Sequence, residues 1–119
     1  MSRPVKLRKV CDLPESNEFG PLDSALGHRD FVNMEIDEYE TIRLIDLEGF
    51  SQEECASQMN VSRPTVQRIY MDARKKMAES LINGKVLIIK GGQYQLCQGL
   101  GNGCGRGCRK KRHRGLFRE

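Results

Sequence analysis

Apolar residues in the centre of the chain recur at steps of three and four, which is typical of a helix that buries one face. A first helix is predicted to begin after Ile36, with Asp37 as its N-cap, and to end at Gly49. Its apolar positions are Tyr39, Ile42, Leu44, Ile45 and Leu47.

A second, shorter helix is predicted over Gln52–Met59. Ser51 and Glu54 have the spacing of a capping box, in which each side chain accepts a hydrogen bond from the other's backbone N–H. Phe50 and Cys55 have the spacing of the accompanying hydrophobic staple. Cys55 therefore belongs to the predicted buried face, where a thiol behaves as a small apolar group.

A third helix is predicted after Ser62, which can cap it, with Pro64 in the first turn, where the missing N–H is harmless. Asn83 and Gly84 end this helix. One buried stripe is expected along it, made of Val66, Ile69, Tyr70, Ala73, Met77 and Leu81.

The segments on either side of the helices have weaker patterns. In residues 1–11, apolar and basic side chains alternate, which favours a short half-buried strand in a basic arm. Residues 12–34 are expected to be irregular, and residues 85–90 and 93–97 are expected to form a hairpin around two glycines. The predicted organisation is thus an arm and irregular segment (1–34), a mainly α domain of three helices with a short C-terminal β-hairpin (35–97), and a basic flexible tail (98–119).

Composition narrows the class of protein. The chain has 119 residues, of which 38% are hydrophobic. It has no apolar run near the ~20 residues that span a bilayer, and its start lacks the apolar centre of a secretory signal. We therefore expect a cytoplasmic protein without a membrane partner, in which the odd count of five cysteines does not indicate structural disulfides.

The net charge of +4 hides a strong segregation of charge. Residues 1–10 carry four cations and no anions, residues 11–60 carry 13 Asp or Glu and two Arg, and residues 61–119 carry 14 Lys or Arg and three acids. Basic segments of this density favour polyanions such as nucleic acid. The acidic middle argues against a protein that coats a polyanion with its whole surface.

The stretch over residues 52–68 meets the requirements of a DNA-binding helix–turn–helix. The first helix needs a small residue where the second crosses, and the turn needs a residue that tolerates positive φ. The motif then needs an apolar residue that packs into the core, a residue that caps the second helix, and a β-branched residue on the buried face of that helix. The five positions are occupied, in this order, by Ala56, Asn60, Val61, Ser62 and Val66.

In this interpretation the third helix enters the major groove of double-stranded DNA with its N-terminal end nearest the bases. Arginine pairs with guanine, glutamine suits adenine, and threonine contacts the thymine methyl group. Lysine and arginine farther along the helix, with the N-terminal cap, would contact phosphates. The predicted DNA-binding residues are Ser62, Arg63, Thr65, Gln67, Arg68, Arg74 and Lys75.

Other functions stay open. The same helix pair could dock a protein such as RNA polymerase, with the acidic first helix as the contact surface. We expect that acidic face to be solvated and to point away from phosphates. A homodimer is also expected, because one helix–turn–helix reads a half-site, and the edge of the hairpin is the candidate surface. An enzyme is not expected, because His28 and His113 lie in predicted loops with no nucleophile at a readable spacing.

The tail contains the remaining candidate chemistry. Cys97, Cys104 and Cys108 are spaced C-x6-C-x3-C, with His113 four intervening residues later, and Cys11 could join them if the N-terminal arm lies beside the hairpin. Three possibilities stay open: a zinc or iron–sulfur site, redox-prone thiols, or a tail without any site. Residues 106–118 are strongly basic and favour a non-specific grip on phosphates over a tail that serves only solubility.

Three segments carry a resemblance to a known family: RPVKLRKVCDLPE, DEYETIRLIDLEGFSQEECASQMNVSRPTVQRIYMDARKKMAESLINGK, and the GG turn that follows. Over about residues 2–97 the chain resembles uncharacterised protein family 0251 (domain of unknown function 134). The resemblance implies a helix–turn–helix similar to region 4 of sigma factors, predicted DNA binding, and DNA contacts at Ser62, Arg63, Thr65, Gln67 and Arg68. Some relatives are joined to, or encoded beside, a domain similar to iron–molybdenum cofactor carriers, which this chain lacks.

Overall fold

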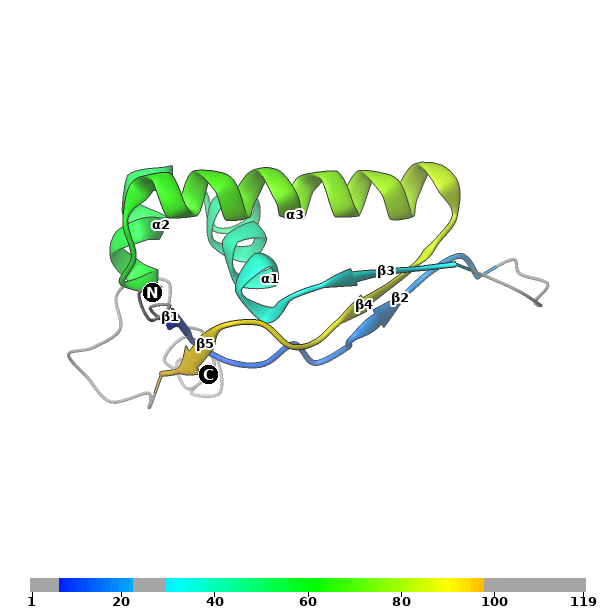
Figure 1. Cartoon of the computed structure of the whole chain (residues 1–119), viewed down its shortest axis with the longest axis horizontal. Coiled ribbons are helices and arrows are strands. Elements are labelled where there is room, and N and C mark those ends of the chain that lie inside the picture. Colours follow the sequence, from blue (N-terminus) through cyan, green and yellow to red (C-terminus); the bar gives the residue numbers. More distant parts are fainter. Residues whose placement is uncertain (1–6, 23–29, 98–119) are drawn as a thin grey trace, which may run out of the picture.

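The computed structural model describes residues 7–22 and 30–97. About half of these residues are helical, and the strands lie together on one side of the helices (Figure 1). The long helix α3 runs along the opposite side, and α1 lies between it and the strands. The helical elements are α1 (Ile36–Ile42), the π-helical turn η1 (Arg43–Leu47), α2 (Gln52–Met59) and α3 (Arg63–Asn83), and the strands are β1 (Arg8–Val10), β2 (Glu18–Phe19), β3 (Phe31–Met34), β4 (Val86–Ile89) and β5 (Tyr94–Leu96).

The strands form two small sheets, and the predicted C-terminal hairpin is wrong. β4 and β5 both exist, but β4 lies between antiparallel β2 and parallel β3, while β5 pairs in parallel with β1. Both edges of β4 are therefore already hydrogen-bonded, which leaves none for β5. Gly91 and Gly92, with φ of 79° and 105°, carry the chain from one sheet to the other.

The N-terminal segment is more ordered than its sequence predicts. The short half-buried strand in residues 1–11 is confirmed as β1. Residues 12–34, predicted to be irregular, contain β2 and β3. These strands have few residues, and their register comes from β4 rather than from their own pattern, so that Val32 faces Leu87 and Met34 faces Ile89.

Helix α1 begins two residues earlier than predicted. Its N-cap is Glu35, whose backbone N–H donates to the Glu38 carboxylate at 2.9 Å. After Ile42 the helix widens into η1, where the N–H of Glu48 donates to the carbonyl of Arg43 at 2.9 Å, five residues back. The chain then turns at Gly49, which has a φ of 82°, as the sequence predicts.

Two apolar clusters hold the molecule together, and α3 reaches both of them. The first joins the strands to α1 and to Ala73 of α3, and it includes Val10, Val32, Met34, Ile36, Leu87 and Ile89. The second joins η1, α2 and the start of α3, and it consists of Leu44, Phe50, Cys55, Ala56, Met59 and Val66. The predicted burial of Cys55 is confirmed.

The predicted buried stripe of α3 is only half correct. Val66, Ile69 and Ala73 are buried and Tyr70 is half-buried, but Met77 is 41% and Leu81 82% exposed. The reason is length: a 21-residue helix extends about 32 Å, beyond the reach of α1 and α2. Its C-terminal half overhangs the β2–β4–β3 sheet. Between them lies an apolar groove of about 560 Å³, lined by Phe19, Met34, Tyr39, Ile42, Met77 and Leu81 among others.

Candidate nucleic-acid interface

The connection between α2 and α3 is set by local hydrogen bonds. At the start of α2, Ser51 Oγ accepts from the N–H of Glu54 at 3.0 Å, and the Glu54 carboxylate accepts from the N–H of Ser51 at 2.9 Å. Asn60 ends α2 in the left-handed conformation, with φ 63° and ψ 44°. This is the one non-glycine residue with positive φ in the described ranges. The capping box and the turn residue predicted from the sequence are confirmed.

Three residues then complete the turn and begin α3. Val61 is half-buried and packs against the second apolar cluster. Ser62 caps α3, and its Oγ accepts from the N–H of Thr65 at 3.3 Å and lies 2.9 Å from the Thr65 hydroxyl. Ala56 and Val66 are buried in the same cluster, as predicted. The angle between α2 and α3 is therefore held by side chains on both sides of the turn.

The N-terminal half of α3 presents a polar face to solvent. Arg63, Gln67 and Arg68 are exposed, while their neighbours Val66 and Ile69 are buried. Thr65, also predicted as a DNA contact, is half-buried and engaged with the Ser62 cap. The structure thus brings three of the predicted base-reading side chains onto one surface. It gives Ser62 and Thr65 a role in starting the helix.

Met71 belongs to this surface and was missed by the sequence prediction. It is 63% exposed although it lies in the middle of α3. A helix turns about 100° per residue, so Met71 lies one turn beyond Gln67 and opposite the buried stripe. That spacing is readable from the sequence. A methionine, however, is ordinarily expected in the core.

The predicted phosphate contacts farther along α3 have different surroundings. Lys75 is exposed. Arg74 lies over the ring of Tyr70, 5.4 Å from its centroid, and its Nε is 3.9 Å from Asp46. The Tyr70 hydroxyl donates to Asp46 at 2.7 Å, and this hydrogen bond raises the pKa of Tyr70. The Arg74 side chain therefore contacts Asp46 of η1, whereas the Lys75 side chain extends into solvent.

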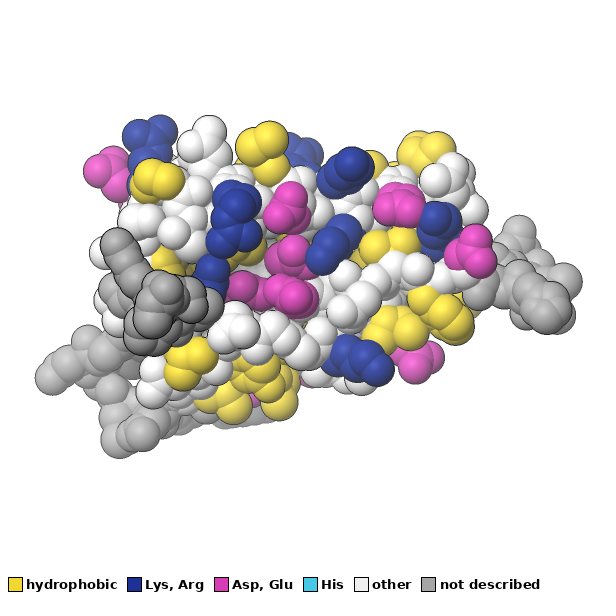
Figure 2. Space-filling model, in the orientation of Figure 1, with side chains coloured by type: hydrophobic (Ala, Val, Ile, Leu, Met, Phe, Trp, Pro, Cys, Tyr) yellow, Lys and Arg dark blue, Asp and Glu magenta, His cyan; other side chains and the backbone are white. Residues whose placement is uncertain are grey.

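The acidic first helix, predicted to be solvated, is so only at its end, where Asp46 is exposed and Glu48 is half-buried. Asp37, Glu38 and Glu40 are at most 5% exposed. Glu38 accepts from Lys76 of α3 at 2.7 and 3.0 Å, and Asp37 lies 3.5 Å from Arg8 of β1. Figure 2 shows Asp and Glu side chains gathered beneath the middle of α3, with Lys and Arg side chains around them.

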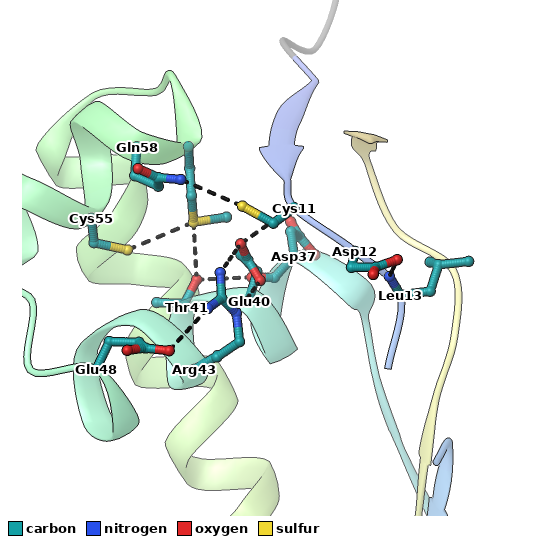
Figure 3. A network of polar contacts seen from close by, with 11 residues as sticks. Cys11, Asp12, Leu13, Asp37, Glu40, Thr41, Arg43, Glu48, Cys55 and Gln58 are labelled. Carbon is teal, nitrogen blue, oxygen red and sulfur yellow. Dashed lines mark hydrogen bonds and ion pairs between the residues drawn. The ribbon is translucent and has the colours of Figure 1, made fainter. Parts of the chain in front are cut away.

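Glu40 is fully buried and forms the centre of an ionic network with Arg43. The Arg43 guanidinium donates to both Glu40 oxygens, at 3.0 and 2.8 Å, and to Glu48 at 3.2 Å (Figure 3). Burial by itself lowers the pKa of Arg43, but the hydrogen bonds and charge of Glu40 outweigh it and hold the pKa above its ordinary value. Nearby, burial and the Glu35 carboxylate raise the pKa of Asp37, while Arg8 opposes the rise. Carboxylates that meet cations inside the fold add little negative charge to the surface near α3.

The predicted metal ligands fall into two groups. Cys11 follows β1 and Cys97 follows β5, and the two buried side chains pack against each other as a small separate cluster. Cys104 and Cys108 lie outside the described residues. Within residues 7–22 and 30–97, no group of three or more His, Cys, Asp or Glu side chains is placed to hold a metal ion.

Residues 1–97 match the family described as "Protein of unknown function DUF134". The chain belongs to the DUF134 family. It is 70% identical over 114 residues to a "UPF0251 protein" of Desulfitobacterium hafniense strain Y51, covering 96% of this chain and 91% of the relative. A UPF0251 protein of Caldicellulosiruptor bescii is 50% identical over 94 residues, which are 79% of this chain and 65% of the relative. One from Thermoanaerobacter sp. strain X514 is 46% identical over 96 residues, covering 81% and 85%.

These relatives support the family resemblance noted in the sequence. No solved structure matches the chain. Among the described residues, no helix has the length and apolar character that crossing a membrane requires.

Proposed function

We propose that this DUF134 protein is a transcriptional regulator that binds double-stranded DNA sequence-specifically through a helix–turn–helix similar to that of sigma region 4. In this proposal α2 and α3 form the motif, and α3 is the recognition helix. The carrying observation is the polar face of α3 formed by Arg63, Gln67 and Arg68, whose opposite side is anchored in the core. A recognition helix needs both an exposed polar face and a buried opposite face, because base contacts require side chains that are held rigidly in place.

Each exposed side chain has a chemical partner in the major groove. Arg63 and Arg68 can each form two hydrogen bonds with a guanine, and Gln67 can do the same with an adenine. Met71 adds an apolar contact of the kind that reads the thymine methyl group. The N-terminus of α3 and the ammonium group of Lys75 would bind phosphates, and such contacts position the helix without distinguishing between sequences.

The charge distribution supports this orientation. In the described ranges, Arg63, Arg68 and Lys75 are exposed cations on α3, whereas Lys76 is engaged by Glu38. The buried carboxylates of α1 lie on the opposite side of α3 from this face and are neutralised by cations inside the fold. Arg63, Arg68 and Lys75 attract a phosphate backbone that approaches α3, while the exposed carboxylate of Asp72 on the same helix opposes this attraction.

In vitro selection from random DNA tests the proposal. We expect the full chain to enrich a defined motif, and Arg63→Ala to lose the preference for guanine at one position of it. That loss corresponds to about 1–3 kcal/mol of discrimination. Lys75→Ala is the matched control: it should weaken binding to all sequences alike and leave the motif unchanged, because a phosphate contact carries no sequence information. An identical motif for wild type and Arg63→Ala would refute the assignment.

The selection also separates the alternative functions. If no sequence is enriched and a protein such as RNA polymerase is recovered instead, the helix pair is a docking module. Asp37, Glu38 and Glu40 are buried, so a partner that docks on the acidic first helix would meet mainly Asp46 and Glu48 at its end. A homodimer stays a prediction from the half-site argument, and the hairpin edge suggested for it does not exist.

The same proposal includes binding of DNA phosphates by the basic tail. Replacing the four basic residues 109–112 with serine removes their charge and leaves the tail cysteines in place. If these side chains bind phosphates, a plot of log affinity against log salt should become less steep by roughly 0.9 for each phosphate that is no longer neutralised. The same plot for the wild-type chain is the reference. A slope that does not change would show that the tail does not touch DNA.

A further inference from the structure

The parallel pairing of β1 with β5 brings together two cysteines that are 86 positions apart in the sequence. Val10 is paired with Leu96, so Cys11 and Cys97 are the next residues in register. The N–H of Cys97 donates to the carbonyl of Val10 at 2.8 Å, so the two chain segments are still hydrogen-bonded at this point. In-register residues of a parallel pair point to the same face, and the two buried side chains contact each other there.

We propose that Cys11 and Cys97 form a reversible disulfide when the chain meets a hydroperoxide. Neighbouring strands lie about 4.8 Å apart, and a disulfide joins residues whose Cα atoms are about 4.4–6.8 Å apart. Two in-register side chains on one face therefore meet the distance requirement without a shift of the backbone. Both cysteines are reduced in the structure, so this bond would be a modification of the fold as it stands.

The accessibility of the two sulfurs sets the order of the reaction. Cys97 is 8% exposed and Cys11 is 1% exposed, so the peroxide reaches Cys97 first. The Cys97 sulfur takes one oxygen from hydrogen peroxide, which gives a sulfenic acid and one water. The Cys11 sulfur then attacks the sulfenic sulfur, the S–S bond forms, and the S–OH bond breaks to release a second water. Two thiols are thus oxidised by two electrons in total, and one peroxide is reduced.

Hydrogen bonds from two helices place Cys11 for this attack. Gln58 of α2, 7% exposed, donates from Nε2 to Cys11 Sγ at 3.4 Å (Figure 3). The backbone N–H of Cys11 donates to the carboxylate of Glu40 in α1 at 3.2 Å. The sulfur is therefore held next to Cys97 instead of rotating away from it. An oxidised neighbour that is already in contact needs no rearrangement of the chain to be reached.

Cys55 provides the contrast within the same molecule. It is also buried, but no other cysteine belongs to its cluster within the part of the chain that the structure describes. Its Sγ lies 3.6 Å from the sulfur of Met59, and burial raises the pKa of its thiol to about 12. Because it has neither a thiol partner nor ready ionisation, Cys55 should stay reduced, and it serves as the internal control.

Hydrogen peroxide added to the reduced full chain tests the bond. The assay uses Cys104→Ser/Cys108→Ser, which removes two competing thiols and keeps the three cysteines that the structure describes. The thiols that remain after oxidation are blocked with N-ethylmaleimide in denaturant, and the linked peptides are identified by mass spectrometry. We expect Cys11 linked to Cys97 and Cys55 blocked. Cys55→Ser in the same background is the matched control and should form the same bond.

Thermal unfolding provides a second measurement. The bond closes a loop that contains all the helices, and a cross-link over so long a loop restricts the unfolded chain. The oxidised chain should therefore unfold at least about 10 °C above the reduced chain, and dithiothreitol should reverse the rise. Cys11→Ser and Cys97→Ser should show no rise. If either of them does not fold, the linkage is still decided in the variants that keep both cysteines.

Four results would overturn the proposal. They are Cys11 and Cys97 both found blocked after peroxide, a bond from Cys97 to a tail cysteine in the oxidised wild-type chain, an oxidised chain no more stable than the reduced one, and a co-purified metal ion that Cys11→Ser loses. In the last case the thiols would serve as ligands. An effect of the disulfide on DNA affinity would rest on the proposed function, whereas the bond itself does not. Because no assay contains DNA, the two proposals can fail separately.

Discussion

Arg43→Met should destabilise the protein by about 3–5 kcal/mol, because it leaves the carboxylate of Glu40 buried without its main cationic partner. Glu40 is 0% exposed and accepts from two nitrogens of Arg43. The hydrogen bond that remains, from the N–H of Cys11 at 3.2 Å, does not replace a full positive charge. Urea unfolding followed by circular dichroism measures the change in the free energy of unfolding.

Two further variants show whether the loss comes from the unpaired charge. In the double variant Glu40→Leu/Arg43→Met both charges are gone, and most of the lost stability should return, since a buried ion pair can often be exchanged for apolar groups at little cost. Arg68→Met makes the same chemical change on the exposed face of α3 and should stay within about 0.5 kcal/mol of wild type. If Arg43→Met costs no more than Arg68→Met, the ionic network does not stabilise the fold.

Arg63→Ala/Arg68→Ala should lower the affinity for the selected DNA site at least about 30-fold. Each arginine that forms two hydrogen bonds with a guanine is worth about 1–3 kcal/mol, and 2 kcal/mol corresponds to about a 30-fold change. Both side chains are exposed, so the free energy of unfolding should change by less than about 0.5 kcal/mol for each. Fluorescence anisotropy with the selected duplex, at fixed salt, gives the affinity.

The matched control removes the same charge from the strand side of the molecule. Lys9 lies in β1, and Lys90 directly follows β4, away from the exposed face of α3. Lys9→Ala/Lys90→Ala should weaken binding only by the long-range effect of net charge, and this effect diminishes as salt is raised. Equal losses in the two double variants would mean that net charge, and not base reading by α3, accounts for binding.

Features that depend on neighbours in the sequence were predictable. The capping box of Ser51 and Glu54, the left-handed Asn60 and the Ser62 cap all involve residues at most four positions apart. Their geometry is decided by the chain itself, and for that reason the α2–α3 connection could be predicted residue by residue. The start of α1 was not predicted, because Asp37 is the preferred type of cap residue, whereas the helix is capped by Glu35 and the N–H of Ile36 donates to the carbonyl of the distant Gly91.

Features that depend on distant partners were not predictable. The strand over residues 86–89 reads equally well as half of a hairpin, and only the presence of β2 and β3 shows which edges it uses. Met77 and Leu81 have the spacing of a buried stripe, but whether they are covered depends on how far α1 extends beneath α3. Met71 lies opposite the predicted stripe, but only the structure shows that its side chain is exposed.

The sequence by itself determined the three helical segments, the caps of α2 and α3, the turn between these two helices, and the face of α3 that bears Arg63, Gln67 and Arg68. These follow from hydrogen bonds and periodicities that extend over a few residues. The tertiary structure alone decided where the acidic residues lie and which cysteines meet. Glu38 and Lys76 are 38 positions apart and Cys11 and Cys97 are 86 apart. Burial of a charge or a thiol depends on partners that only the folded chain brings together.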